Sequence, residues 1–193
     1  TEAIRLDPKY ALAYGQRGNA YLGQGEFDNA ITDYSEAIRL DPESPFSFRE
    51  RGSRYCGKGD YGKAVADFRK AIELEPDDAR DHYALALAHL GAGEIEEYRK
   101  ACASMLEQFG DTDDPDSAQW VACTCVLMPD EYNDLTHVVQ LAEMAVDADS
   151  QAPHVTTLGA ARYRAGQYQQ AIKCLSDLAA KWEEGADKPT LAS

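Results

Sequence analysis

Two arginine–aspartate pairs recur with the same spacing, and these residue types can form strong two-bond ion pairs. Arg17 precedes Asp33 by 16 residues, and Arg51 precedes Asp67 by the same distance along the chain. A guanidinium group is a planar fork of donors that matches the two oxygens of a carboxylate. We therefore predict structural ion pairs between facing helices. The alternative is that these arginines bind a ligand.

Residue patterns typical of catalysis or metal binding are absent from the sequence. The four histidines are scattered, and there is no glycine-rich phosphate loop, His-Glu-x-x-His motif or nucleophile elbow. The acidic run Asp111–Asp116 partly resembles a calcium-binding loop, but it lacks the turn glycine, and Ala122 stands where the final glutamate is needed. Helix capping by Asp116 or Ser117 explains these acids adequately. We predict no enzymatic activity, no metal and no cofactor.

Negative charge dominates the chain and is unevenly distributed. The formal net charge is -15, and residues 101–161 include eleven acids and no Lys or Arg. This balance argues against a basic surface that binds nucleic acid. We expect the acidic stretch to form a solvated surface, with aspartates at helix N-termini. The alternative is a docking surface for a basic partner.

The cysteines and the hydropathy of the chain bear on its location. Five cysteines form an odd set without the spacing of a disulfide framework. This usage favours reduced thiols and a cytoplasmic location. The sequence has no run of 18 apolar residues and no basic, apolar leader at its start, so no membrane partner is expected.

A period of 34 residues organises the first half of the chain. At this offset the sequence repeats Gly18 as Gly52, Tyr21 as Tyr55, Ala30 as Ala64, Tyr34 as Phe68, Ala37 as Ala71, and Pro42 as Pro76. A constant offset at so many positions indicates a stacked array of one supersecondary unit. One period after Arg51 and Asp67, both members of the pair are replaced, by Leu85 and Ala101. This joint replacement favours the ion-pair interpretation.

Each unit is predicted to consist of two antiparallel helices. Gly-x-Gly sequences such as the one ending at Gly25 allow a left-handed turn after the first helix, and prolines such as Pro42 end the second. The predicted helices are 11–23, 27–40, 45–57, 61–74, 79–91, 94–108, 116–128, 133–147, 152–165 and 168–182. Gly18 lies in the middle of a helix, where we expect its small size to allow close approach of the equally small Ala30.

These residues resemble the tetratricopeptide repeat (TPR), whose pattern combines aromatic residues, glycine, alanine and a terminal proline. The pattern appears as Tyr14, Gly18, Tyr21, Ala30, Tyr34, Ala37 and Pro42, then as Phe48, Gly52, Tyr55, Ala64, Phe68, Ala71 and Pro76, and again in Leu158, Gly159, Gly166, Tyr168, Ala171 and Leu175. The third unit departs from it at Tyr98, where the pattern has a small residue. The resemblance implies an all-α fold, a right-handed superhelix (α-solenoid) of antiparallel helix pairs.

The resemblance also implies the domain organisation, a single TPR-like array over residues 1–193. We assign 1–8 to the end of a preceding repeat, 11–44 to repeat 1, 45–78 to repeat 2, 79–110 to a degenerate repeat 3, 116–150 to a divergent repeat 4, 152–182 to repeat 5, and 183–193 to a polar tail. Residues 1–8 match 35–42 almost identically. We therefore expect the chain to be a fragment of a larger protein.

In a TPR array the first helix of each pair lines the inner surface, where residues three or four apart share a face. This placement gives the peptide-groove candidates Asn19, Phe46, Arg49, Ser53, Arg80, Tyr83 and Leu87. Arginines beside aromatic residues would suit a peptide that is acidic or carries a carboxylate. The alternative is that Arg49 and Arg80 are solvated, or paired with acids such as Glu50 or Asp81.

The function that the resemblance implies is a non-catalytic protein–protein interaction module, which receives a peptide or helix in its concave groove. One alternative is a structural scaffold that self-associates through the open ends of the array. Another is a regulatory array appended to an enzyme, such as a bacterial Ser/Thr kinase. Neither nucleic acid nor a membrane is expected as a partner.

Overall fold

The computed structural model describes residues 2–127 and 135–186, with side chains described as far as residue 181. Within these ranges all regular secondary structure is helical, which confirms the predicted all-α class. The chain divides into two compact units, Thr1–Ala101 and Cys102–Ser193, each of which is described by itself.

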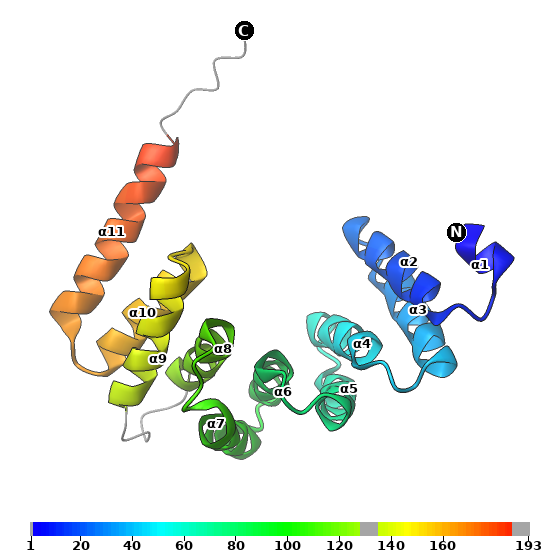
Figure 1. Cartoon of the computed structure of the whole chain (residues 1–193), viewed down its shortest axis with the longest axis horizontal. Helices are drawn as coiled ribbons and strands as arrows, with labels where there is room; N and C mark the ends of the chain where they lie inside the picture. Colours follow the sequence, from blue (N-terminus) through cyan, green and yellow to red (C-terminus); the bar gives the residue numbers. More distant parts are fainter. Residues whose placement is uncertain (1, 128–134, 187–193) are drawn as a thin grey trace, which may run out of the picture. The chain divides into compact units, whose positions relative to one another are not determined.

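Unit 1 (Thr1–Ala101) is built from consecutive helices that pack on their neighbours in the sequence (Figure 1). Its helices are α1 (Glu2–Leu6), α2 (Ala11–Gly23), α3 (Phe27–Leu40), α4 (Pro45–Gly57), α5 (Tyr61–Leu74), α6 (Ala79–Gly91) and the start of α7 (Ile95–Phe109). α2 packs against α3, and α4 against α5; α3 also contacts α4, and α6 contacts both α4 and α5. This is the arrangement of stacked helix pairs that the 34-residue period predicts.

Unit 2 (Cys102–Ser193) continues from the second half of α7 and repeats the same helix-pair arrangement. Its further helices are α8 (Pro115–Val126), α9 (Leu135–Ala148), α10 (Ala152–Arg164) and α11 (Tyr168–Ala186). α8 pairs with α9 and α10 pairs with α11, while α10 also packs on α8 and α9. α11 extends four residues past the expected end at 182, so 183–186 are helical; the rest of the expected polar tail lies outside the described residues.

Glycines with positive φ follow four of the helices, α2, α4, α6 and α10. Gly25, Gly59, Gly93 and Gly166 have φ values of 75°, 78°, 76° and 74°. This left-handed region is costly for residues with a Cβ atom but open to glycine. The chain can therefore pass to the next helix within three residues, and the left-handed turns predicted at Gly25, Gly59 and Gly93 are confirmed.

The glycines in the middle of the first helices make room for a large side chain. A Cβ atom added at Gly18 would lie 2.9 Å from Cε1 of Tyr34, and one added at Gly52 would lie 3.1 Å from Cε1 of Phe68. The space beside each glycine is therefore filled by an aromatic ring of the partner helix, a position for which the sequence analysis had named the small Ala30. In unit 2 the same relation joins Gly159 to Leu175.

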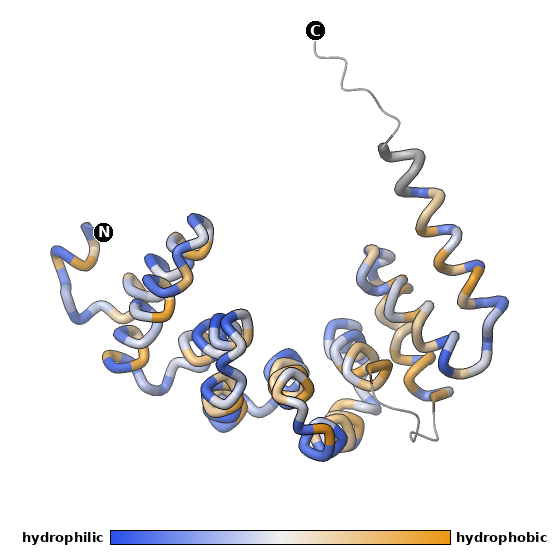
Figure 2. The backbone as a smooth tube through the Cα atoms, turned by 180° about the vertical axis from the view of Figure 1, so that it is seen from behind, coloured by the Kyte–Doolittle hydropathy of each residue, from blue (hydrophilic) through white to orange (hydrophobic). Residues whose placement is uncertain are grey.

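The core of each unit combines these large side chains with alanines. Tyr34 and Phe68 are buried in unit 1 together with alanines such as Ala64, while Val121 and Leu141 are buried in unit 2. Apolar and polar residues alternate along the helices in Figure 2, as expected for helices with one buried face. Burial of these apolar faces stabilises the helix pairs by removing their surface from water.

Candidate functional site

The structure brings the two arginine–aspartate pairs together as two-bond ion pairs. Nε and Nη2 of Arg17 each donate to Asp33 over 2.7 Å, joining α2 to α3. Arg51 donates to Asp67 over 2.8 and 2.7 Å, joining α4 to α5. Both aspartates are buried, so their carboxylates depend on these arginines for compensation. The four residues hold helix pairs together and leave little donor capacity for a ligand.

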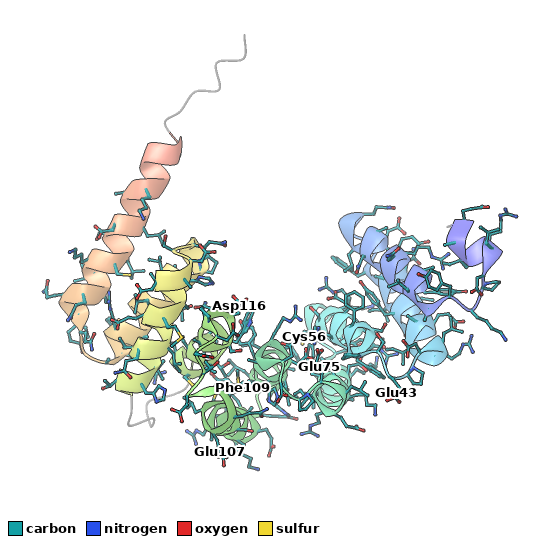
Figure 3. All side chains as sticks on the ribbon, viewed as in Figure 1. Glu43, Cys56, Glu75, Glu107, Phe109 and Asp116 are labelled. Carbon is teal, nitrogen blue, oxygen red and sulfur yellow. The ribbon has the colours of Figure 1, made fainter. Side chains whose placement is uncertain are left out.

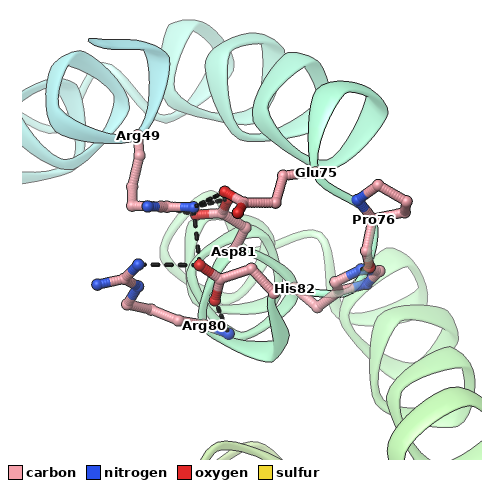
Figure 4. Close-up of polar contacts among 7 residues, drawn as sticks. Arg49, Glu75, Pro76, Arg80, Asp81 and His82 are labelled. Atoms are coloured by element: carbon pink, nitrogen blue, oxygen red, sulfur yellow. Dashed lines mark hydrogen bonds and ion pairs between the residues drawn. The ribbon is translucent and has the colours of Figure 1, made fainter. Parts of the chain in front are cut away.

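Arg49, a groove candidate, is enclosed by acids of its own chain (Figure 4). Its guanidinium group donates to Glu75 at 3.1 Å, to Asp78 at 2.8 Å and to Asp81 at 2.7 Å. The Arg49 side chain is only 13% exposed, and that of Asp81 is fully buried. Arg49 therefore links α4 to the start of α6 instead of facing a ligand, which is the alternative that the sequence left open. The arginine also supplies the positive charge at this carboxylate cluster.

Asp78 connects this cluster to Arg80, a second groove candidate. Asp78 caps α6 by accepting from the backbone N–H of Arg80 at 3.0 Å, and it also accepts from the Arg80 guanidinium at 2.9 Å. Burial raises the pKa of Asp78, but the bonds from Arg80 and the charge of Arg49 outweigh it and hold the pKa below its usual range. The Arg80 side chain is half exposed. It can contact a partner, although one acid already pairs with it.

Asn19 and Phe46 lie apart from the other candidates. Oδ1 of Asn19 accepts a hydrogen bond of 2.6 Å from the Tyr34 hydroxyl, across the α2–α3 pair. Phe46 is partly exposed and lines a small hollow of about 80 Å³ beside Gly15. Neither residue shares a cavity with the candidates on α6.

Three groove candidates, Ser53, Tyr83 and Leu87, line one hollow between α4, α5 and α6. Its volume is about 510 Å³, and its remaining lining residues are Cys56, Tyr61, Phe68, Ala84, Leu90 and Gly91. Cys56, labelled in Figure 3, is on the wall that α4 provides. We call this hollow the α4–α6 pocket. Its volume is within the range of natural ligand-binding clefts.

The α4–α6 pocket is apolar and uncharged. Every lining residue is neutral, and Phe68 forms part of its wall while packing on the buried Ala64 and Ala88. Burial raises the pKa of the Cys56 thiol, so this wall carries no thiolate at neutral pH. An apolar side chain can therefore enter the pocket and lose contact with water without leaving a charge unpaired.

Arg54, which the sequence analysis did not single out, is bonded to Ser53 of the pocket wall. Its Nη2 donates to Oγ of Ser53 at 2.8 Å, and its Nε is buried without a hydrogen-bond partner. It has no aspartate at the recurring 16-residue spacing, so the sequence pattern that matched Arg17 and Arg51 gives no partner for it. Only the folded arrangement shows that its position differs from theirs.

Unit 2 contains a hollow of similar size with a different character. It has a volume of about 530 Å³ and is lined from α9, α10 and α11 by apolar residues together with acids and bases. Arg162 donates to Glu143 at 2.8 Å on its wall. None of the predicted groove candidates lies here. The described cysteines are free thiols in both units.

Comparison with family models identifies the repeats. The family model described as "Tetratricopeptide repeat" matches residues 11–44, and the one described as "TPR repeat" matches residues 52–93. Two segments of the chain match tetratricopeptide repeats. The second TPR match includes α5, α6 and part of α4, from which the α4–α6 pocket is built. No curated protein matches the chain by sequence.

Several solved TPR-type structures share this fold. The chain is 20% identical to PilF of Pseudomonas aeruginosa, with a TM-score of 0.67, covering 88% of this chain and 75% of that one. It is 19% identical to MamA from Desulfovibrio magneticus RS-1, with a TM-score of 0.62 and coverages of 92% and 97%. It is 17% identical to YrrB, described as "a TPR protein with an unusual peptide-binding site", with a TM-score of 0.59 and coverages of 91% and 88%.

The TPR assignment supports a broad class of function. TPR repeats in general serve protein–protein interaction, and the matches support this broad class of function for the chain. Among the described helices, none combines the length and apolar character that a bilayer span requires.

Proposed function

We propose that the chain is a peptide-binding module whose α4–α6 pocket receives an apolar side chain of a partner protein. The observation that carries this proposal is the uncharged hollow of about 510 Å³, lined by Tyr83 and Leu87 of α6. In this proposal the partner segment is an extended peptide or a helix that inserts one apolar residue. Rigid helix pairs hold the pocket open before binding, so little ordering entropy is lost by the receptor.

The pocket provides the contacts that a side-chain anchor needs. Tyr61 and Phe68 of α5 and Tyr83 of α6 supply aromatic surface, and Cys56 adds a neutral thiol. A leucine- or phenylalanine-sized side chain that leaves water here gains about 1.5–3 kcal/mol from burial. Such a gain accounts for only part of a micromolar affinity, which corresponds to about -8 kcal/mol. Backbone and flanking contacts of the peptide must supply the rest.

Replacing Leu87 with aspartate is expected to weaken peptide binding at least tenfold. The change removes apolar surface from the pocket and places a carboxylate against the incoming side chain, which would then be buried beside a charge. Peptides are first selected from a displayed random library on the wild-type chain, and their Kd values are then measured by fluorescence anisotropy for the wild type and for Leu87→Asp.

The matched control is Leu87→Met, which conserves volume and apolar character. It should bind the selected peptides within about threefold of the wild type, given the small cost of such swaps. Thermal unfolding followed by circular dichroism checks that all three proteins are folded. If the selected peptides bind Leu87→Asp as tightly as the wild type, the α4–α6 pocket is not the binding site.

Self-association is a second candidate function, favoured by an exposed apolar face on α11. Tyr168, Ile172 and Leu175 are 55%, 59% and 41% exposed, whereas Tyr34 and Phe68 are nearly fully buried at the positions equivalent to Leu175. In unit 1 the next helix covers that face, since α4 packs on α3 and α6 packs on α5. A helix of a second copy of the chain would cover the α11 face in the same way.

Light scattering after size-exclusion chromatography tests this second candidate. We expect the mass of the wild type to rise with concentration, and Ile172→Lys to remain monomeric because the change places a charge in the contact. Gln170→Lys adds the same charge on the opposite side of α11 and should associate like the wild type. A wild-type mass that stays at one chain over the whole concentration series rules out self-association through α11.

A further inference from the structure

We propose that Arg54 is an anion-binding anchor beside the α4–α6 pocket, so that the preferred partner is a peptide in which an acidic side chain flanks the inserted apolar residue. This inference rests on the proposed function, because it names the chemical class of peptide for the same site. It assigns the charged contact to Arg54 instead of Arg49, which its own chain already neutralises.

The first argument is the pairing of the other partly buried arginines on α2 and α4. Arg17, Arg49 and Arg51 each bind at least one carboxylate through two or more donated bonds. Arg54 forms its one side-chain hydrogen bond among the described residues with the neutral Ser53 hydroxyl. Its Nε is buried and donates to nothing in the described part of the chain. Arg54 is thus a partly desolvated cation without a counter-charge in contact.

The second argument is the location of Arg54. Its hydrogen-bond partner Ser53 lines the α4–α6 pocket, so the guanidinium group lies at the edge of that cavity. A peptide whose apolar side chain occupies the pocket can place a neighbouring side chain at this edge. A carboxylate there would receive charge-assisted bonds from donors that are otherwise unused or bound only to a hydroxyl. An acid beside an apolar residue therefore matches both features of the site.

The ionisable groups near Arg54 determine which negative charges compete with a ligand for it. The pKa of the Tyr34 hydroxyl is raised to about 12, mainly by burial. Two nearby charges also act on it: Glu50 raises the pKa and Arg54 lowers it. Tyr34 is therefore neutral at pH 7, and Asp33, which also acts on it, is bound by Arg17. Glu50 is a carboxylate near this cation that forms no ion pair with the described residues, and it should repel an acidic peptide.

A comparison of peptide selections tests the inference on the full chain. A random-peptide library is displayed with its C-terminal ends fused to the carrier, so that side chains supply the carboxylates. It is selected in parallel on the wild type, Arg54→Gln and Leu87→Asp. We expect wild-type peptides to share an apolar residue next to Asp or Glu. Arg54→Gln should select the apolar residue without the acid, because glutamine can keep the bond to Ser53 but carries no charge.

Synthetic peptides then measure the size of the effect. Changing the acid of a selected, amidated peptide to its amide should weaken binding to the wild type about tenfold, as expected for a charge-assisted bond. The same change should have no effect on binding to Arg54→Gln. Arg54→Lys should retain part of the preference for the acid. Glu50→Gln, on the same helix, should bind acidic peptides more tightly than the wild type does, because it removes the competing carboxylate.

The outcomes separate this inference from the proposed function. The role of Arg54 is refuted, and the pocket proposal is not, by either of two results. One is that wild-type peptides share an apolar residue without a neighbouring acid. The other is that the Glu-to-Gln change in the peptide weakens binding to the wild type and to Arg54→Gln by the same factor. If no apolar residue is enriched, or Leu87→Asp selects the same peptides as the wild type, the proposed function fails. Thermal melts of each variant exclude unfolding as the cause.

Discussion

Replacing Arg49 with alanine is expected to lower the free energy of unfolding by about 3–5 kcal/mol, the cost typical of removing one partner of a buried ion pair. Arg49 is bound to Asp81, whose carboxylate is fully buried, and to Asp78 and Glu75. Without the arginine, three carboxylates remain close together, and Asp81 has neither water nor a cation to stabilise its charge. Urea unfolding followed by circular dichroism measures the change.

The acidic cluster provides its own control. Arg80→Ala removes a cation that also binds Asp78, but the Arg80 side chain is half exposed. An exposed pair of this kind contributes about 0–1 kcal/mol. We therefore expect Arg49→Ala to cost several times more than Arg80→Ala. Equal and small losses for the two variants would show that Arg49 is not structural, and would return it to the list of ligand-binding candidates.

Replacing Phe68 with alanine is expected to cost a similar 3–5 kcal/mol, because it leaves a cavity in the core of unit 1. The ring is 2% exposed, packs with Ala64 and Ala88, and fills the space that Gly52 leaves open. Phe68 also lines the α4–α6 pocket, so the same change alters the shape of the binding site. We expect peptide affinity to fall together with stability, measured by urea unfolding and anisotropy.

The first repeat suggests the control for this prediction. Tyr34 is at the position equivalent to Phe68 and donates its hydroxyl to Asn19; the residue equivalent to Asn19 in the second repeat is Ser53. Phe68→Tyr therefore places a hydroxyl where a polar partner is available and should cost less than about 1.5 kcal/mol. A loss for Phe68→Ala as small as that for Phe68→Tyr would show that the ring does not support the core.

Local signals explain why the helix positions could be predicted from the sequence. The five helices from 11 to 91 begin and end at the predicted residues, because each end is marked by a turn glycine or by a proline shortly after it. Elsewhere the agreement is looser: α7 begins at Ile95 instead of 94, and α11 extends to Ala186. The single continuous array and the fragment status stay predictions.

Whether the partner of an arginine could be predicted depended on whether its spacing recurs in the sequence. Arg17 and Asp33 could be matched because the same spacing reappears in Arg51 and Asp67. The partners of Arg49 occur once, 26 to 32 residues away, so no repetition in the sequence reveals them. Arg54 differs from Arg49 only in lacking such partners after folding. In the function proposed here the ligand contact is assigned to Arg54, whereas the sequence suggested Arg49 and Arg80; the groove residues stay a prediction.

Tyr34 and Phe68 are at equivalent positions of successive repeats, and this position limits how the binding preference of the second repeat can change. The Phe68 ring is both part of the core and a wall of the α4–α6 pocket. Substitutions of this ring therefore destabilise the fold as well as change the ligand preference. Ser53, Tyr83 and Leu87 line the same cavity but remain partly exposed. Substitution at these three positions can retune recognition while the scaffold is preserved, and they are the natural sites for redesigning the module toward a chosen peptide.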